Sequence, residues 1–304
     1  MYSVTQRIRN IKQPWGGYIK CKDFSVTELS DGKELHSKEN LHASLIGLAV
    51  DYLTRFVMGA LPSDAFKISL LGASAVKEDK KATKLLHSIK GLDNDSIYNA
   101  CKLVGYDVCV RAGMAGYKPV DEINADKATI ENITIMVQRS VHFWKKYGPI
   151  VKDGFTFEGG YTPIVSTGDG DYLTQDTLWD FKVSKEEPKS KYTLQLLMYY
   201  LMGIHSVHEE FKAIKNLGIY NPRKNKVYLL KISSIPQSVL DDVSYTVIGY
   251  GITREDYIDF LKGEYEKQGI NARSAQMLLD LQLSIFDKKE NATKNAAFSK
   301  QEKL

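Results

Sequence analysis

The stretch that decides the fold reads Gly168-Asp-Gly-Asp-Tyr-Leu-Thr-Gln-Asp-Thr-Leu-Trp-Asp-Phe-Lys-Val-Ser-Lys185. Side chains alternate in direction along a strand, so Asp180 and Lys182 share one face and their apolar neighbours point to the other. A turn at 174–176 would bring Asp171 alongside Asp180. The segment therefore predicts two paired strands that gather two carboxylates and one ammonium group at one point of an apolar sheet.

Two carboxylates at one point are suited to a divalent metal ion, because Mg²⁺ and Mn²⁺ prefer hard oxygen ligands and Mg²⁺ keeps several waters. Such an ion polarises a phosphoryl oxygen and acidifies a bound water, which Lys182 would orient or help to deprotonate. An Asp-x-Lys strand is also common as an exposed ion pair worth about 0–1 kcal/mol. The neighbours Leu178, Trp179 and Phe181 favour a buried strand, where unpaired charge is costly.

The surrounding sequence predicts an α/β fold with a mixed β-sheet flanked by helices. Apolar residues at helical spacing predict a helical region over 40–150, whose longest helix runs from Ala128 to Tyr147. The expected strands of the sheet region, 151–235, are 155–158, 171–173, 177–183, 217–220 and 226–232, with a helix at 192–204. Further helices are expected over 236–286. One domain, 1–286, would then be followed by a flexible basic tail, 287–304.

Composition excludes several classes of protein. Of the 304 residues, 43% are hydrophobic and 26% are charged, which excludes a disordered chain, a collagen-like fibre and a coiled-coil rod. The net charge of +4 is weak evidence for a polyanionic partner. Three cysteines without a C-x-x-C pair suit a reducing cytoplasm, and no iron–sulfur cluster is expected. No apolar run reaches the roughly 18 residues of a membrane span, so we expect a cytoplasmic protein without membrane contact.

A second motif follows the Asp-x-Lys strand. Gln195 and Tyr199 are one helical turn apart and share a face. The run Gly-x-x-Asp, then Asp-x-Lys, then Gln-x-x-x-Tyr resembles the PD-(D/E)XK nuclease superfamily, and within it the RecB-like exonuclease group. The resemblance covers about 40–60 and 155–232 and implies a restriction-endonuclease-like core with Mg²⁺-dependent cleavage of phosphodiesters.

The resemblance also implies roles for single residues. Asp171 and Asp180 would hold the metal ion, and Gln195 would position the scissile phosphate or the catalytic strand. The family takes a further acidic ligand from an upstream helix, which corresponds here to Asp51; the alternative is an i,i+4 ion pair between Asp51 and Arg55. The proline of the family name is missing before Asp171. Other candidates stay open: Asp169 in place of Asp171, and Glu158 as an additional ligand.

Basic residues near the motif fit a DNA track. Six of them and no acidic residue lie between Lys212 and Lys231. The expected DNA-binding residues are Lys185, Tyr199, Arg223, Lys224 and Lys226. Tyr220 and Tyr228 are candidates to stack on unpaired bases, with core packing as the alternative. A solvated pair of strands would give the same run of charges, so this pattern alone does not decide for DNA.

Near the end of the chain, Gln282-Leu-Ser-Ile-Phe286 resembles the pentapeptide by which bacterial polymerases and repair proteins bind the sliding clamp. The resemblance implies that Gln282 caps one end and that Leu283 and Phe286 enter an apolar pocket of that partner. The alternative is an amphipathic helix packed on the domain.

The sequence thus favours a Mg²⁺- or Mn²⁺-dependent DNA nuclease. The resemblance connects it with DNA end processing, recombination, repair or defence against foreign DNA such as that of phages, and exonuclease and endonuclease activity both stay open. A module that binds nucleic acid or acts as a scaffold on the same fold without cutting is the rival hypothesis. Hydrolysis of a small phosphorylated compound ranks last, because the sequence has no P-loop.

Overall fold

The computed structural model describes the backbone of residues 1–301 and the side chains of residues 1–288. Its strands are β1 (Tyr2–Ser3), β2 (Ser25–Glu28), β3 (Lys152–Phe155), β4 (Val165–Thr167), β5 (Gly170–Leu173), β6 (Thr177–Phe181), β7 (Asn216–Asn221) and β8 (Lys226–Lys231). Its α-helices are α1 (Val4–Asn10), α2 (Ala43–Val57), α3 (Pro62–Ala65), α4 (Lys67–Ala75), α5 (Asp79–His87), α6 (Asn94–Leu103), α7 (Asp107–Arg111), α8 (Lys127–Tyr147), α9 (Ser190–Ile204), α10 (Gln237–Asp242), α11 (Arg254–Lys267) and α12 (Ala272–Gln301).

The main sheet has six strands in the order β2-β8-β7-β6-β5-β3. Only β6 and β7 pair in parallel, and the other neighbours are antiparallel. A parallel pair needs a crossover connection, which α9 supplies between β6 and β7. The expected mixed sheet flanked by helices is confirmed.

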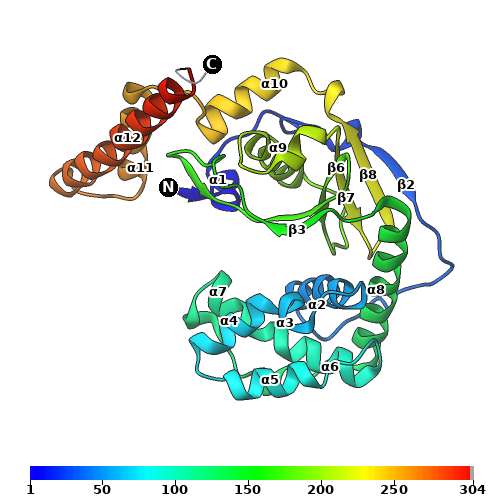
Figure 1. Ribbon diagram of the computed structural model, residues 1–304. Coiled ribbons are helices and arrows are strands. Elements are labelled where there is room, and N and C mark those ends of the chain that lie inside the picture. The colour runs from blue at the N-terminus through cyan, green and yellow to red at the C-terminus, as the bar shows by residue number, and fades with distance from the viewer. Residues whose placement is uncertain (302–304) are drawn as a thin grey trace.

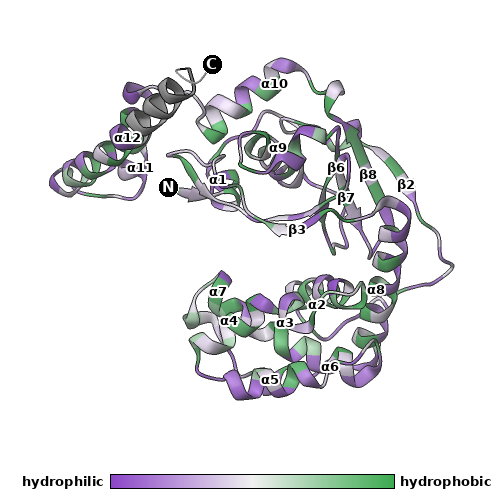
Figure 2. Ribbon diagram, in the orientation of Figure 1, coloured by the Kyte–Doolittle hydropathy of each residue, from purple (hydrophilic) through white to green (hydrophobic). Residues whose placement is uncertain are grey.

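Each face of the sheet has its own hydrophobic core. On one face, residues of α9 pack with Leu178 and Leu217 of the sheet and with the C-terminal helices. On the other face, Phe143 of α8 stacks on Tyr220 with ring centroids 3.9 Å apart and meets Trp179 edge-on. β8 is hydrophobic along most of its length, whereas hydrophilic residues run along α5 (Figure 2).

Helices α2 to α7 form a helical lobe, and α8 connects this lobe with the sheet (Figure 1). The expected helical region between 40 and 150 therefore contains seven helices, and its longest is α8, as predicted. Helix α2 packs against α8, so the lobe is joined to the sheet largely through α8.

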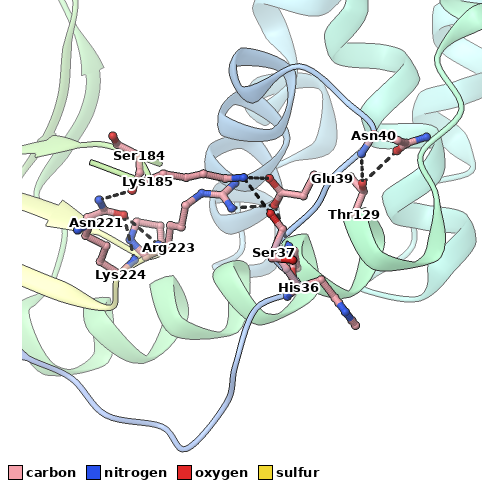
Figure 3. A network of polar contacts seen from close by, with 12 residues as sticks. His36, Ser37, Glu39, Asn40, Thr129, Ser184, Lys185, Asn221, Arg223 and Lys224 are labelled. Carbon is pink, nitrogen blue, oxygen red and sulfur yellow. Dashed lines mark hydrogen bonds and ion pairs between the residues drawn. The ribbon is translucent and has the colours of Figure 1, made fainter. Parts of the chain in front are cut away.

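A long connection between β2 and α2, residues 29–42, lies across α8 and is called the strap below. Arg139 of α8 holds its start, since Nε is 2.7 Å and Nη2 2.9 Å from the carboxylate oxygens of Asp31. Glu39 near its end pairs with Arg223 at 2.8 Å (Figure 3). Both side chains of this second pair are less than a tenth exposed. The strap therefore connects α8 and the β7–β8 turn through one partly exposed and one buried ion pair.

The C-terminal helices α11 and α12 pack side by side, away from the sheet (Figure 1). The backbone of α12 is helical up to Gln301, so no helix end falls at the expected start of a tail, residue 287. Residues 302–304 of that tail lie outside the described residues. In the described part of the chain, we find no helix with both the length and the apolar character that crossing a membrane requires.

Candidate active site

The β5–β6 pair brings the two predicted carboxylates together. Tyr172 stands opposite Trp179 in the antiparallel register, and one step further along the same register Asp171 stands opposite Asp180. The backbone N–H of Phe181 donates to Asp171 Oδ2 at 2.8 Å, which fixes this carboxylate beside β6. Both acids face α9, because their neighbours Tyr172 and Trp179 belong to the core on the opposite face.

Asp180 is buried without ordinary hydrogen-bond partners. Its side chain is 1% exposed, and neither carboxylate oxygen accepts a hydrogen bond. Its one close cation is Lys182, whose Nζ lies 2.8 Å from Oδ1 as an ion pair. Burying a carboxylate this way costs free energy unless a cation compensates for the lost hydration. The site therefore has a buried negative charge that one ammonium group only partly satisfies.

Burial and neighbouring charges change the pKa of Asp171 and the pKa of Lys182. Burial raises the pKa of Asp171 to about 7, and the neighbouring charge of Asp180 adds to the rise. Burial alone would lower the pKa of Lys182, but Asp180 and Asp171 outweigh it and raise this pKa above its ordinary value. Lys182 is therefore an ammonium group here, which fits the orienting role expected from the sequence better than deprotonation of water.

Helix α9 covers this cluster with the predicted Gln-x-x-x-Tyr motif. Gln195 Nε2 donates to the Tyr199 hydroxyl at 2.9 Å, so the two side chains lie on one face as expected. Burial raises the pKa of Tyr199, and the charges of Asp171 and Lys182 also act on it, which places its hydroxyl near them. Tyr199 is 4% exposed and stacks on Phe157. Protein already covers the ring of Tyr199, which leaves its hydroxyl as the group for the expected contact with DNA.

Asp51 lies close to the cluster, but its carboxylate accepts hydrogen bonds from residues outside the cluster. Arg55 Nε donates to Asp51 Oδ1 at 3.2 Å, and the Tyr172 hydroxyl donates to the same oxygen. The i,i+4 pair that was the alternative to a metal role is thus present. The Asp51 charge still contributes to the raised pKa of Asp171. Across the described residues, no group of three or more His, Cys, Asp or Glu side chains is arranged to hold a metal ion.

The other acidic candidates lie outside the cluster. Asp169 is exposed to solvent, whereas Asp171 is held against β6, which favours Asp171 as the ligand. Glu158 accepts a hydrogen bond from Thr156 and lies 3.4 Å from His208. Its side chain is largely exposed, so the structure gives it no part in the arrangement around Asp180.

No match to this chain was found among protein-family models, curated proteins or solved structures. The likeness to PD-(D/E)XK nucleases therefore stays a resemblance carried by the residues described above. Those residues are Asp171, Asp180 and Lys182 on the sheet and Gln195 with Tyr199 on α9.

Most of the predicted basic track is neutralised by acidic side chains. Lys224 Nζ lies 2.6 Å from Glu187, and Lys226 Nζ lies 2.9 Å from Glu28. Arg223 is 7% exposed in its ion pair with the strap, which leaves little of its side chain for the expected contact with DNA. The partners come from segments far away in the sequence, which is why the run looked unpaired.

Lys185 is the exposed member of that set. Its side chain is 60% exposed, and its Nζ lies 3.3 Å from the Ser37 carbonyl oxygen of the strap (Figure 3). The same nitrogen lies 3.8 Å from a carboxylate oxygen of Glu39, and the contact of Lys185 with DNA stays a prediction.

The clamp-like segment is part of α12. Leu283 and Phe286 are less than a tenth exposed, and Phe286 stacks on Tyr257 of α11 with centroids 4.9 Å apart. Gln282 accepts a long hydrogen bond, 3.4 Å, from the Tyr257 hydroxyl. The amphipathic helix named as the alternative is what the structure shows, because the two anchor side chains are already buried in the protein.

Sequence reasoning missed Tyr192, which lies beside the cluster. Lys182 Nζ is 5.4 Å from the centre of its ring, within the range of a cation–π contact. Tyr192 lies three residues before Gln195 on the same helix, and this spacing was the available signal. The pocket beside Lys182 is also lined by Ser184, Pro188 and Tyr192.

A larger cavity than the pocket beside Lys182 lies elsewhere. It has a volume of about 590 Å³ at the β5–β6 turn, and its charged lining residues are Asp176 and Lys215. None of the carboxylates of the cluster lines it, so its size does not make it the candidate active site.

Proposed function

We propose that this protein is a divalent-metal-dependent nuclease that hydrolyses phosphodiester bonds of DNA. The observation that carries the proposal is Asp180, a buried carboxylate that stands opposite Asp171 and whose close polar contact is the Lys182 ammonium group. Buried like charges beside a single cation recur at functional sites. The Gln195–Tyr199 face of α9 supports the proposal, because it covers the same cluster.

The donor set fits a hard divalent cation. Asp171 and Asp180 would hold it. Burial and, after it, the charge of Asp180 raise the pKa of Asp171, and a bound cation would offset both effects. Two carboxylates with waters are a usual set for Mg²⁺, so a third protein ligand is not required. When bound, such an ion supplies Lewis acidity toward a phosphoryl oxygen and toward water.

The side chains of the chain have separable roles in this reaction. Lys182, as an ammonium group, would orient the attacking water and offset negative charge on the phosphate. Gln195 would position the substrate from α9, with its amide held by Tyr199. Hydrolysis forms a bond between the water oxygen and phosphorus as the opposite phosphorus–oxygen ester bond breaks in line. Asp51 is held by Arg55 next to the site and would act on it only through charge.

The experiment is cleavage of linear and of circular DNA with Mg²⁺ or Mn²⁺. We expect Lys182→Ala to reduce cleavage by at least about a hundredfold, as is usual for loss of one charge-stabilising group. Asp169→Asn is the matched control, because Asp169 is an exposed acid two residues from Asp171 and should retain activity. A preference for linear over circular DNA would indicate end processing.

Cleavage that survives in Lys182→Ala would contradict the proposal. Absence of cleavage of either DNA by the wild type, together with intact DNA binding, would favour a non-cutting module on the same fold. Roles in recombination, repair or defence against foreign DNA follow from the resemblance and become testable once the preferred substrate is known.

A further inference from the structure

One large apolar side chain is exposed beside the proposed active site. Trp15 is 95% exposed, whereas Trp144 and Trp179 are each 2% exposed in the core. Single exposed apolar residues are common. A solvent-exposed indole ring, however, forgoes the large stabilisation that burying its apolar surface would give. Its exposure is therefore a feature to be explained.

The backbone holds Trp15 at the corner of a tight turn. The N–H of Gly17 donates to the Pro14 carbonyl at 2.8 Å, and Gly16 has a φ of +84°. This is the pattern of a type II turn, in which a glycine takes the third position and the second position points outward. A side chain at Gly17 would place its Cβ 2.7 Å from the Cβ of Ser190, so this glycine lets the turn lie directly against α9.

Two further contacts attach the same loop to the segment between Lys182 and Gln195. The Cys21 thiol donates to the Pro188 carbonyl at 2.8 Å, and Pro188 lines the pocket that contains Lys182. The Thr193 hydroxyl donates to the Ile19 carbonyl at 2.8 Å. The residues that directly follow the Trp15 turn are thus fixed to the segment that lines the pocket beside Lys182.

The surface around Trp15 carries positive charge. Its exposed cations are Arg9, Lys12, Lys20 and Lys22. None of the four forms a salt bridge with any side chain that the structure describes. Asp23 is the only acidic residue among the first 24 residues. This charge contrasts with the neutralised run at Lys224 and Lys226, so the loop is the better place for a polyanion.

We propose that the Trp15 turn is a stacking platform for an unpaired base of single-stranded nucleic acid whose backbone continues toward Asp180. The inference rests on the proposed nuclease function and specifies its substrate as a single strand or an unpaired end. Unpaired bases expose the flat face that an indole ring stacks on, whereas paired bases in a duplex do not. A membrane surface fits less well, because Ile11, Tyr18 and Ile19 beside Trp15 are wholly or partly buried and give no apolar face.

The intrinsic fluorescence of tryptophan can report this contact. Because Trp144 and Trp179 are buried, Trp15 is the indole accessible to a ligand. We expect single-stranded oligothymidylate, added without divalent metal, to quench tryptophan fluorescence saturably, and Trp15→Phe to lose the quenching signal but keep the affinity. Trp15→Ala should weaken binding of a labelled oligothymidylate roughly tenfold, the effect of losing one stacked base. Tyr245→Ala is the control, since Tyr245 is a half-exposed aromatic residue outside this loop.

Wild-type affinity in Trp15→Ala would overturn the inference, and so would quenching by vesicles of anionic phospholipid but not by oligothymidylate. These results are separable from the nuclease test, because binding is measured without metal. If Lys182-dependent cleavage is found while Trp15→Ala binds normally, the platform is wrong and the nuclease stands. If Trp15→Ala weakens binding while no metal supports cleavage, the platform stands and the nuclease is wrong.

Discussion

Asp180 is the residue whose surroundings differ most from those of an ordinary surface acid. It sits on a strand whose five residues are all buried, and Lys182 alone balances its charge at short range. The sequence predicted the shared face of these two side chains from the alternation along the strand. It could not predict that both carboxylate oxygens would lack hydrogen bonds, because that depends on which atoms of α9 and β5 come near.

A divalent cation should stabilise the wild-type protein through this residue. At a concentration about a hundredfold above its Kd, Mg²⁺ or Mn²⁺ should add about 2.7 kcal/mol to the free energy of unfolding. Asp180→Asn should abolish this stabilisation, whereas Asp169→Asn should retain it. Thermal unfolding with and without the metal measures the effect, and an equal shift in Asp180→Asn would argue against a metal at this place.

At the scale of the elements, the strands around the site were predicted well and the interactions between distant elements were not. The observed β5, β6, β7 and β8 lie within two residues of their expected bounds, because runs of apolar and β-branched residues are local signals. The strand expected at 155–158 lies three residues earlier in the structure, as β3, Lys152–Phe155. Strands β1 and β4, of two and three residues, were too short to show a period.

The clamp-like segment shows how one pattern can serve two structures. Leucine and phenylalanine three residues apart suit a docking peptide and equally suit the buried face of a helix. The burial of Leu283 and Phe286 distinguishes the two, and no local feature of the sequence reports it.

Helix α12 should therefore contribute to stability through these side chains. Leu283→Ala and Phe286→Ala should each lower the free energy of unfolding by about 2–4 kcal/mol, as for other large-to-small core changes. Leu281→Ala is the control, because its side chain is 58% exposed on the same helix. Denaturant unfolding measures the difference. Unchanged stability in both core variants would show that the segment is free for a partner.

At the scale of the whole molecule, the strap links α8 with the turn between β7 and β8. Two of its ion pairs join residues that are 108 and 184 positions apart in the chain. Such pairs leave no periodic signal, so the sequence did not indicate that Arg223 is paired with Glu39. Because the paired residues are far apart in the sequence, these ion pairs are long-range contacts that restrain the folded chain.

Removing the first of these pairs should destabilise the protein in a pH-dependent way. The hydrogen bond from Arg139 lowers the pKa of Asp31 below its ordinary value, so the ionised form stabilises the fold. Asp31→Asn should cost about 1–3 kcal/mol at neutral pH, since the buried Arg139 loses a charged partner. The difference from wild type should be complete above about pH 4, the unfolded pKa of Asp, and should shrink as the pH falls further.

The measurement is the melting temperature of both proteins across that pH range. Glu209→Gln is the control, because the Glu209–Lys212 pair is more than 70% exposed on both sides and should not affect melting. A constant difference between wild type and Asp31→Asn down to the lowest pH would mean that the ion pair is not the source of the stability.

The order of strands has a further consequence for behaviour at high concentration. The sheet ends at β2 on one side and β3 on the other, and unpaired edge strands invite strands from other copies to add on. Strand β2 is only four residues long and carries Glu28, while β3 carries Lys152 and Asp153 and is interrupted by Gly154 with a φ of +54°. Edge strands that are short, charged or kinked disfavour edge-to-edge aggregation. Both edges of this sheet therefore disfavour the addition of a strand from another copy of the protein.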